Sequence, residues 1–311
     1  MNAEQCAALL LEQDRILLVT HYNPDGDTVA SAAALCSALR RQGKTACLFP
    51  NEQVGSRLRG YAGRFFASEG FRPDYTVAVD VATEKMFPRG FSGAVDLAID
   101  HHPTNSHYAA AECIDDRRAA CGEIVLKIVR ALGGGVTKEE ADLLYIALST
   151  DCGCFLYANT DAHAHRTAAE LLELGADVAD INQEFFRQVS PARLRLEGMV
   201  YSAMRFYRDG QIAVNLITQE MLRASGVTEE ELDDIAGLVG RARGHRVGLT
   251  IRENPDGSSK VSARCGADFD VSALCARFGG GGHKMAAGCN IQAPPEEARE
   301  LLVRAIEDMW T

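Results

Sequence analysis

The chain has 311 residues, and its 43 acidic and 32 basic side chains give a formal net charge of −11 at pH 7. This length exceeds that of a usual single domain and predicts two domains. The acidic balance argues against sequence-independent binding of long nucleic acid, which requires a basic face, and leaves small phosphorylated ligands as compatible partners.

We expect neither a membrane-spanning segment nor a secretory signal peptide. No run of about 18 or more apolar residues occurs, so we predict no membrane-spanning helix. The N-terminal residues lack the basic region and apolar core of a signal peptide, and a cytoplasmic location is therefore expected.

Ten cysteines are scattered along the chain, mostly in apolar stretches. In a cytoplasmic protein this pattern predicts small buried side chains and no disulfide framework. Cys152 and Cys154 are the exception, because they lie beside Asp151 in a polar segment. A single cysteine pair is a weak signal for zinc, and packing next to a site is the favoured interpretation.

Short apolar segments alternate with helix-forming segments in the first half of the chain. Strands are predicted at residues 15–19, 45–49, 75–79 and 95–99, and helices at 29–39, 121–132 and 138–149. This alternation predicts a parallel sheet with right-handed crossovers, and the nearly all-apolar strands indicate burial on both faces. The expected fold class is α/β, with a doubly wound, mainly parallel sheet.

The second half of the chain contains a helical part, followed by a part in which strands and helices are mixed. Residues 160–207 have a helical pattern, and a helix that begins at Ser190 and Pro191 has the length and position of a connector. Beyond residue 210, strands are predicted at 211–217, 245–252 and 260–264, a hairpin turn at 254–257, and helices at 228–240, 270–277 and 295–309. We therefore expect a first domain at 1–185, a helical connector at 186–207 and a smaller α+β domain at 208–311.

Metal-ligand residue types follow the predicted strands where each strand ends. They are His21, Asp25 and Asp27 after the first strand, Asp80 after the third, Asp100, His101 and His102 after the fourth, and Asp151 after the helix at 138–149. The carboxyl ends of parallel strands form one edge, where open α/β sheets bind their ligands. Each of these residues taken alone has a structural explanation. For example, Asp27 or Thr28 could cap the helix that follows the first strand.

Taken together, the carboxylates would repel one another unless cations neutralised them. Imidazole nitrogen and carboxylate oxygen suit Mn²⁺ or Mg²⁺. Their number suits two ions that share a bridging carboxylate, an arrangement typical of phosphoryl transfer.

These motifs resemble those of the DHH phosphoesterases, in the same order along the chain. The C-terminal segment from Phe278 to Gly288, with glycine at 279–282, looks like the glycine-rich signature of the DHH-associated substrate domain. The resemblance covers nearly the whole chain and points to the branch of oligoribonucleases (nanoRNases) and pAp phosphatases, where pAp is 3′-phosphoadenosine 5′-phosphate.

The resemblance implies a role for each residue of the site. His21 and Asp25 would hold one ion, Asp27, His101 and Asp151 a second, and Asp80 would bridge the two. The ions, usually Mn²⁺ in this family with Mg²⁺ or Co²⁺ as alternatives, activate water for in-line attack on phosphorus. His102 would stabilise charge on the phosphate oxygens, and Asp100 would orient a histidine, so that Asp80, Asp100 and His102 form the catalytic group.

In the second domain the resemblance implies substrate binding by Arg264, Gly280, Gly281, Gly282 and His283. Glycine allows the backbone N–H groups to approach an anion closely, and the arginine fork matches two phosphate oxygens. The family more often has serine where Cys265 stands. A basic cluster at 241–246 is either a solvated turn or part of a nucleotide site.

The implied function is a metal-dependent exo-phosphodiesterase that degrades very short RNA to mononucleotides, with 3′(2′),5′-bisphosphate nucleotidase activity on pAp. A phosphodiesterase for pApA or cyclic di-AMP is the alternative within the class. A two-metal inorganic pyrophosphatase is disfavoured by the four-glycine motif, and a nucleotide sensor without turnover by the complete ligand set. Short RNA, pAp or dinucleotides are the expected partners, long duplexes and membranes are not, and a homodimer is left open.

Overall fold

The computed structural model describes residues 1–232 and 235–310. Its contacts divide the chain into two compact units, Met1–Gln188 and Val189–Thr311. None of the described helices combines the length and the apolar character needed to cross a bilayer.

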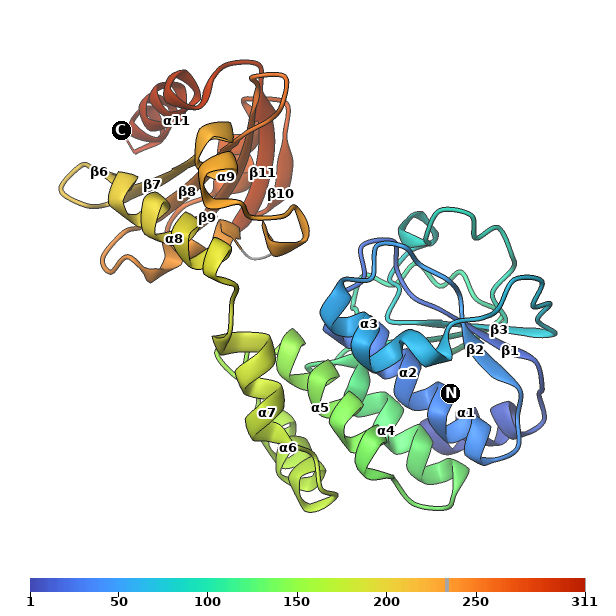
Figure 1. Ribbon diagram of the computed structural model, residues 1–311. Coiled ribbons are helices and arrows are strands. Elements are labelled where there is room, and N and C mark those ends of the chain that lie inside the picture. Colours follow the sequence, from blue (N-terminus) through green and yellow to red (C-terminus); the bar gives the residue numbers. More distant parts are fainter. Residues whose placement is uncertain (233–234, 311) are drawn as a thin grey trace. The chain divides into compact units, whose positions relative to one another are not determined.

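The first unit, coloured blue to green in Figure 1, is built on a five-stranded parallel sheet. The strand order is β2-β1-β3-β4-β5. The strands are β1 (Ile16–Val19), β2 (Ala46–Leu48), β3 (Tyr75–Val79), β4 (Leu97–Asp100) and β5 (Ala111–Ile114). After β2 the chain returns across β1 to form β3, so the strand order reverses between β1 and β3. The carboxyl ends of these two strands therefore form the switch point at which such sheets bind ligands.

Helices of this unit pack on the sheet and on one another. They are α1 (Ala3–Leu11), α2 (Gly26–Arg41), α3 (Ser56–Ala62), α4 (Cys121–Leu132) and α5 (Lys138–Asp151). α2 is the central helix, because its alanine-rich surface is buried and packs against both α4 and α5 (Figure 1). Residues 81–110 supply a small aromatic cluster next to Ala78, with Phe87, Phe91 and Tyr108 as members. The unit ends with α6 (Ala162–Glu173), α7 (Val178–Asn182) and a π-helical turn at Gln183–Arg187.

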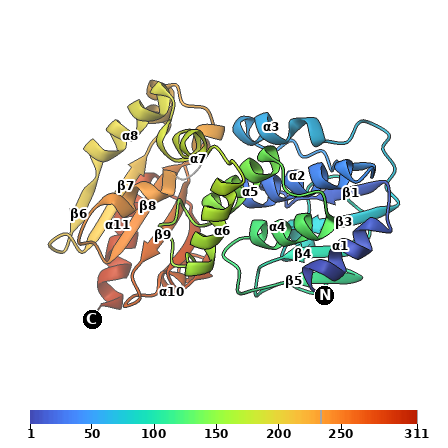
Figure 2. The ribbon, with the colours of Figure 1, turned by 90° about the horizontal axis from the view of Figure 1, so that it is seen from below.

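The second unit contains a six-stranded mixed sheet with the order β10-β11-β9-β8-β7-β6. Its strands are β6 (Arg205–Tyr207), β7 (Ile212–Ile217), β8 (Val247–Glu253), β9 (Ser259–Cys265), β10 (Gly281–His283) and β11 (Ala286–Ile291). Its helices are α8 (Pro191–Ala203), α9 (Gln219–Ser225), α10 (Val271–Ala276) and α11 (Pro295–Met309). α8 packs against β7, and α11 packs against β7 and β8 (Figures 1 and 2). The α/β class and the separate α+β unit agree with the prediction.

Three predicted elements differ in detail. The expected helix at 228–240 consists of 3₁₀ turns at Glu230–Leu232 and Ile235–Arg241, and residues 233–234 lie outside the described residues. The glycine-rich segment forms β10, which pairs with β11 in a hairpin. The helix of the predicted connector, α8, belongs to the second unit and is followed by β6 at residue 205.

Candidate metal centre

The loop after β1 places three of the predicted ligands at the start of α2. Asp25 is the N-cap, since its Oδ1 accepts the Thr28 N–H (3.2 Å), so the alternative interpretation, in which Asp27 or Thr28 caps this helix, is wrong. Asp27 lies in the first turn and is 1% exposed. A Cβ on Gly26 would lie 2.3 Å from Thr150 Oγ1. Glycine therefore lets the start of α2 reach the end of α5, where Asp151 lies.

The carboxylate of Asp27 is oriented by the start of α4. Its Oδ2 accepts the Cys121 N–H (2.6 Å), and its Oδ1 accepts the Gly122 N–H (3.0 Å) and the Ser31 hydroxyl (2.9 Å). N–H groups in a first helical turn have no partner within the helix and favour an anion. Burial nevertheless raises the pKa of Asp27 well above its usual value, and the charges of Asp151 and Asp25 add to this effect.

Asp80 directly follows β3 and has a left-handed backbone conformation, with φ at +59°. The residue is 2% exposed, and its Oδ1 has no hydrogen-bond partner among the described residues. The pKa of this carboxyl lies well above its usual value. Burial is the largest cause, and repulsion from Asp27 and Asp25 adds to it. A buried oxygen without a partner is costly, and a bound cation would compensate this cost. The donor set therefore fits divalent ions.

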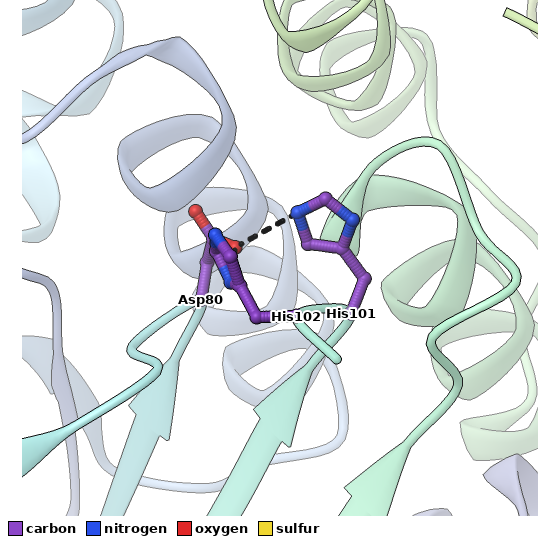
Figure 3. Close-up of side chains that lie close together, drawn as sticks. All are labelled: Asp80, His101 and His102. Atoms are coloured by element: carbon purple, nitrogen blue, oxygen red, sulfur yellow. Dashed lines mark ion pairs between the residues drawn. The ribbon is translucent and has the colours of Figure 1, made fainter. Parts of the chain in front are cut away.

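The segment after β4 supplies both histidines, which stand side by side with Asp80 facing them from the neighbouring strand (Figure 3). His101 Nε2 lies 3.4 Å from Asp80 Oδ1 and 3.8 Å from both Asp27 Oδ2 and Asp151 Oδ2. Its Nδ1 lies 3.1 Å from the carbonyl oxygen of Arg118, to which it can donate. Because the carbonyl accepts that hydrogen, Nε2 is the ring nitrogen that is left able to bind a metal ion.

His102 is oriented by Asp100. Asp100 Oδ1 lies 2.7 Å from His102 Nδ1, and Oδ2 accepts a hydrogen bond from Asn105 Nδ2 (2.6 Å). Burial alone would raise the pKa of Asp100, but the hydrogen bonds from His102 and Asn105 outweigh it and lower the pKa. The same contact with Asp100 raises the pKa of His102 and favours its protonated form.

The predicted ligands converge into groups whose ligand atoms lie within 4.8 Å of one another. One group is His21, Asp25 and Asp80, a second is Asp27, His101 and Asp151, and a third joins Asp80 to His101 and His102. A cavity of about 250 Å³ opens at this place and is also lined by Tyr22, Asn23 and Met86. These three lining residues were not predicted, although Tyr22 and Asn23 lie inside the first motif.

Cys152 and Cys154 take no part in these groups of described residues. Cys152 is fully buried in the core of the first unit, and the Cys154 thiol lies 3.8 Å from Asn182 Oδ1. The burial of Cys152 and the contact of Cys154 are typical of residues that pack in the protein.

The second unit contains a cavity of about 510 Å³ on one face of its sheet, lined by Lys260, Ser262, Arg264, Gly279–Gly282, Ala286–Asn290 and Val261. A Cβ on Gly280 would lie 2.2 Å from the Gly288 carbonyl oxygen, so glycine is needed for this hairpin to close. The predicted residues Arg264, Gly280, Gly281 and Gly282 line the cavity, whereas His283 ends β10 as an exposed residue. Lys260 and Ser262 were missed, although the alternation of β9 places them on the same face as Arg264.

The basic cluster at 241–246 is partly engaged in packing. Arg246 Nε lies 2.6 Å from Asp268 Oδ2, and the guanidinium lies 4.9 Å from the centre of the Trp310 ring. His245 Nδ1 lies 2.6 Å from the Ala242 carbonyl oxygen. These contacts favour the interpretation of the cluster as a structural turn.

Comparison with known proteins agrees with this geometry. The family model described as "DHH family, N-terminal domain" matches residues 15–148, and the "DHHA1 domain" matches residues 209–310. The chain is 31% identical to the bifunctional oligoribonuclease and PAP phosphatase NrnA of Thermus thermophilus, over 95% of this chain and 90% of that protein. It is 25% identical to the Bacillus subtilis protein of the same name, over 93% of each.

Among solved structures, the exopolyphosphatase-related protein of Bacteroides fragilis has a TM-score of 0.82 at 24% identity, covering 98% of this chain and 96% of that one. At this identity the likeness shows the fold alone. The two domain matches and the extended similarity to NrnA establish that this chain belongs to the DHH family, with a DHH N-terminal domain followed by a DHHA1 domain.

Proposed function

We propose that this protein is a phosphoric ester hydrolase that degrades very short oligoribonucleotides to mononucleotides and also dephosphorylates pAp. The observation that carries the proposal is two ligand groups with Asp80 between them: Asp80 belongs to the group of His21 and Asp25, and its Oδ1 lies 3.4 Å from His101 of the other group and has no hydrogen-bond partner among the described residues. The names of the similar NrnA proteins, oligoribonuclease and PAP phosphatase, support this choice within the family.

Two divalent ions, with Mn²⁺ the first choice, would be held by the residues described above. His21 and Asp25 would bind one ion, Asp27, His101 and Asp151 the other, and Asp80 both. Ions bound in this way supply an acidified water and neutralise charge on the phosphate.

Besides the metal ligands, His102 and Asp100 would contribute to the reaction. His102 lines the cavity, and its Nδ1 is held by Asp100, so its other ring nitrogen is available to the substrate. A protonated imidazole in this position stabilises the negative charge that develops on non-bridging phosphate oxygens. Asp100 accepts the Nδ1 hydrogen of this ring, which favours the protonated form and fixes the orientation of the ring.

The second unit would recognise the rest of the substrate. Arg264 and Lys260 supply positive charge at a cavity whose other wall is glycine backbone, and these groups suit a terminal phosphate. Arginine binds two phosphate oxygens through its planar fork, whereas lysine acts as a point charge. His283, at the end of β10, would contribute a further donor. This charge distribution suits a short substrate with a phosphate at its end.

Initial rates on a panel of substrates test the proposal. Purified protein with Mn²⁺ is incubated with RNA oligomers from the dinucleotide upward, pAp, cyclic di-AMP and inorganic pyrophosphate. The fastest turnover is expected on the shortest RNAs, with measurable release of phosphate from pAp. Hydrolysis of pyrophosphate alone would contradict the proposal, and a preference for cyclic di-AMP or pApA would select the alternative. Nucleotide binding without turnover would indicate a sensor.

The cytoplasmic location remains a prediction, and a homodimer remains open. Light scattering coupled to size-exclusion chromatography measures the oligomeric state directly.

A further inference from the structure

One short segment, Arg118–Gly122, contacts two residues of the second ligand group. The carbonyl oxygen of Arg118 lies 3.1 Å from His101 Nδ1, and the N–H groups of Cys121 and Gly122 donate to the carboxylate of Asp27 at 2.6 and 3.0 Å. The segment therefore sets the direction of one imidazole and one carboxylate at the same time.

Asn159 connects the same segment to the third member of the group. Its Nδ2 donates to the carbonyl oxygen of Ala119 (3.1 Å), to the Asp151 carbonyl oxygen (3.1 Å) and to Asp151 Oδ2 (3.3 Å). Asp27 and His101 are thus bonded directly to residues 118–122, and Asp151 is linked to these residues through Asn159. Residues 118–122 and Asn159 together form the support of this ligand group.

Glu123 anchors this support from the interior of the protein. Its side chain is 0% exposed, and Oε2 accepts the Ala119 N–H at 2.8 Å. Oε1 lies 2.5 Å from His163 Nδ1 and accepts the Thr167 hydroxyl at 3.2 Å. A buried carboxylate is costly unless donors surround it. The three donors compensate this cost and fix the carboxylate between α6 and the segment.

We propose that Glu123, held by His163 and Thr167, is a positioning residue for the metal subsite formed by Asp27, His101 and Asp151. The inference rests on the proposed two-ion centre. Without Glu123, Ala119 loses its anchor, and the carbonyl and N–H groups that orient His101 and Asp27 become free to shift. The support involves one of the two ligand groups, so loss of Glu123 affects one ion more than the other.

Mn²⁺ titration of the metal-free, full-length protein, followed by the electron paramagnetic resonance signal of free Mn²⁺, tests the proposal without an activity measurement. Glu123→Ala should weaken one of two bound ions about 10- to 100-fold, the usual effect of removing a group that orients a ligand. Glu123→Gln should restore most of this affinity, because its amide oxygen still accepts the Ala119 N–H.

Glu140→Ala is the matched control for a general loss of stability. Glu140 is also 0% exposed, but it pairs with Arg41 (2.9 Å) and caps the start of α5. This variant should bind both ions as the wild type does. Equal binding of both ions by folded Glu123→Ala would overturn the proposal.

His163→Ala keeps the proposal testable if Glu123→Ala does not fold. The side chain of His163 is 31% exposed, so its removal should be tolerated, and it takes one donor away from Glu123. Weakening of the same ion is expected, and unchanged affinity for both ions would refute the role of Glu123. RNA hydrolysis by the wild type is measured separately. Its absence, with two ions bound, would refute the proposed function and leave the positioning role standing.

Discussion

Asp80→Asn separates the stability of the fold from metal binding. Asp80 is 2% exposed, and its Oδ1 has no hydrogen-bond partner among the described residues, while burial and the negative charges of four other carboxylates raise its pKa. Asparagine keeps the shape of the side chain and removes the buried charge. Its amide N–H groups can donate to the neighbouring carboxylates, and a hydrogen bond to a charged group contributes about 1.5–3 kcal/mol. We therefore expect the metal-free variant to be more stable than the metal-free wild type by an amount within this range.

The order of stability should reverse when Mn²⁺ is added. One ion present at about 100 times its dissociation constant stabilises a protein by about 2.7 kcal/mol, and the wild type has two such sites under the proposal. The variant lacks the shared ligand and should gain much less. Stability is measured by urea unfolding with and without EDTA. Far-UV circular dichroism is the better signal, because the single tryptophan, Trp310, lies in the second unit.

Two results would refute this reasoning. One is a metal-free variant that is clearly less stable than the metal-free wild type, which would mean that Asp80 is a structural residue. The other is an equal gain in stability with Mn²⁺, which would remove Asp80 from the metal centre.

Three further predictions concern glycines and the second-unit cavity. Gly280→Ala places a methyl group 2.2 Å from a carbonyl oxygen of β11 and should lower the free energy of urea unfolding by about 1–3 kcal/mol. Gly281→Ala is the control, because there is open space around its Cβ, and it should change this free energy by less than about 0.5 kcal/mol. Gly26→Ala meets the side chain at the end of α5 at 2.3 Å and should lower both thermal stability and Mn²⁺ affinity, while Gly198→Ala, in an open part of α8, should stabilise by about 0.5–1 kcal/mol. Arg264→Ala should raise the KM for short RNA about ten- to hundred-fold with little change in kcat, and an unchanged KM would exclude a phosphate contact by this residue.

Local sequence patterns determined the fold class and the ligand types. Apolar runs such as residues 75–79 predicted strands, and the polar residue that follows each run lies at the carboxyl edge of the sheet because parallel strands share one direction. The motifs of His21, Asp80 and His101 also carried the resemblance to the DHH family. These features depend on neighbours along the chain, so the sequence was sufficient to predict them.

Elements with a weak local pattern were not predicted. β5 is a half-buried strand that contains Glu112, and β10 is glycine-rich, so neither shows the apolar alternation of a strand. β10 forms because the chain returns at Ala286 to pair with it. Pairing with a distant segment, more than propensity, determines strands of this kind.

The arrangement around the ligands was likewise decided by tertiary structure. Local spacing allowed Asp27 or Thr28 to cap α2, whereas the helix starts at Gly26, which lies in close contact with α5, and Asp25 is the cap. Glu123 and Asn159 carry no motif, and they make contacts with residues 40 positions away along the chain, Glu123 with His163 and Asn159 with Ala119. The residue types of the metal centre are therefore readable from the sequence, whereas the groups that orient them depend on which helices pack together.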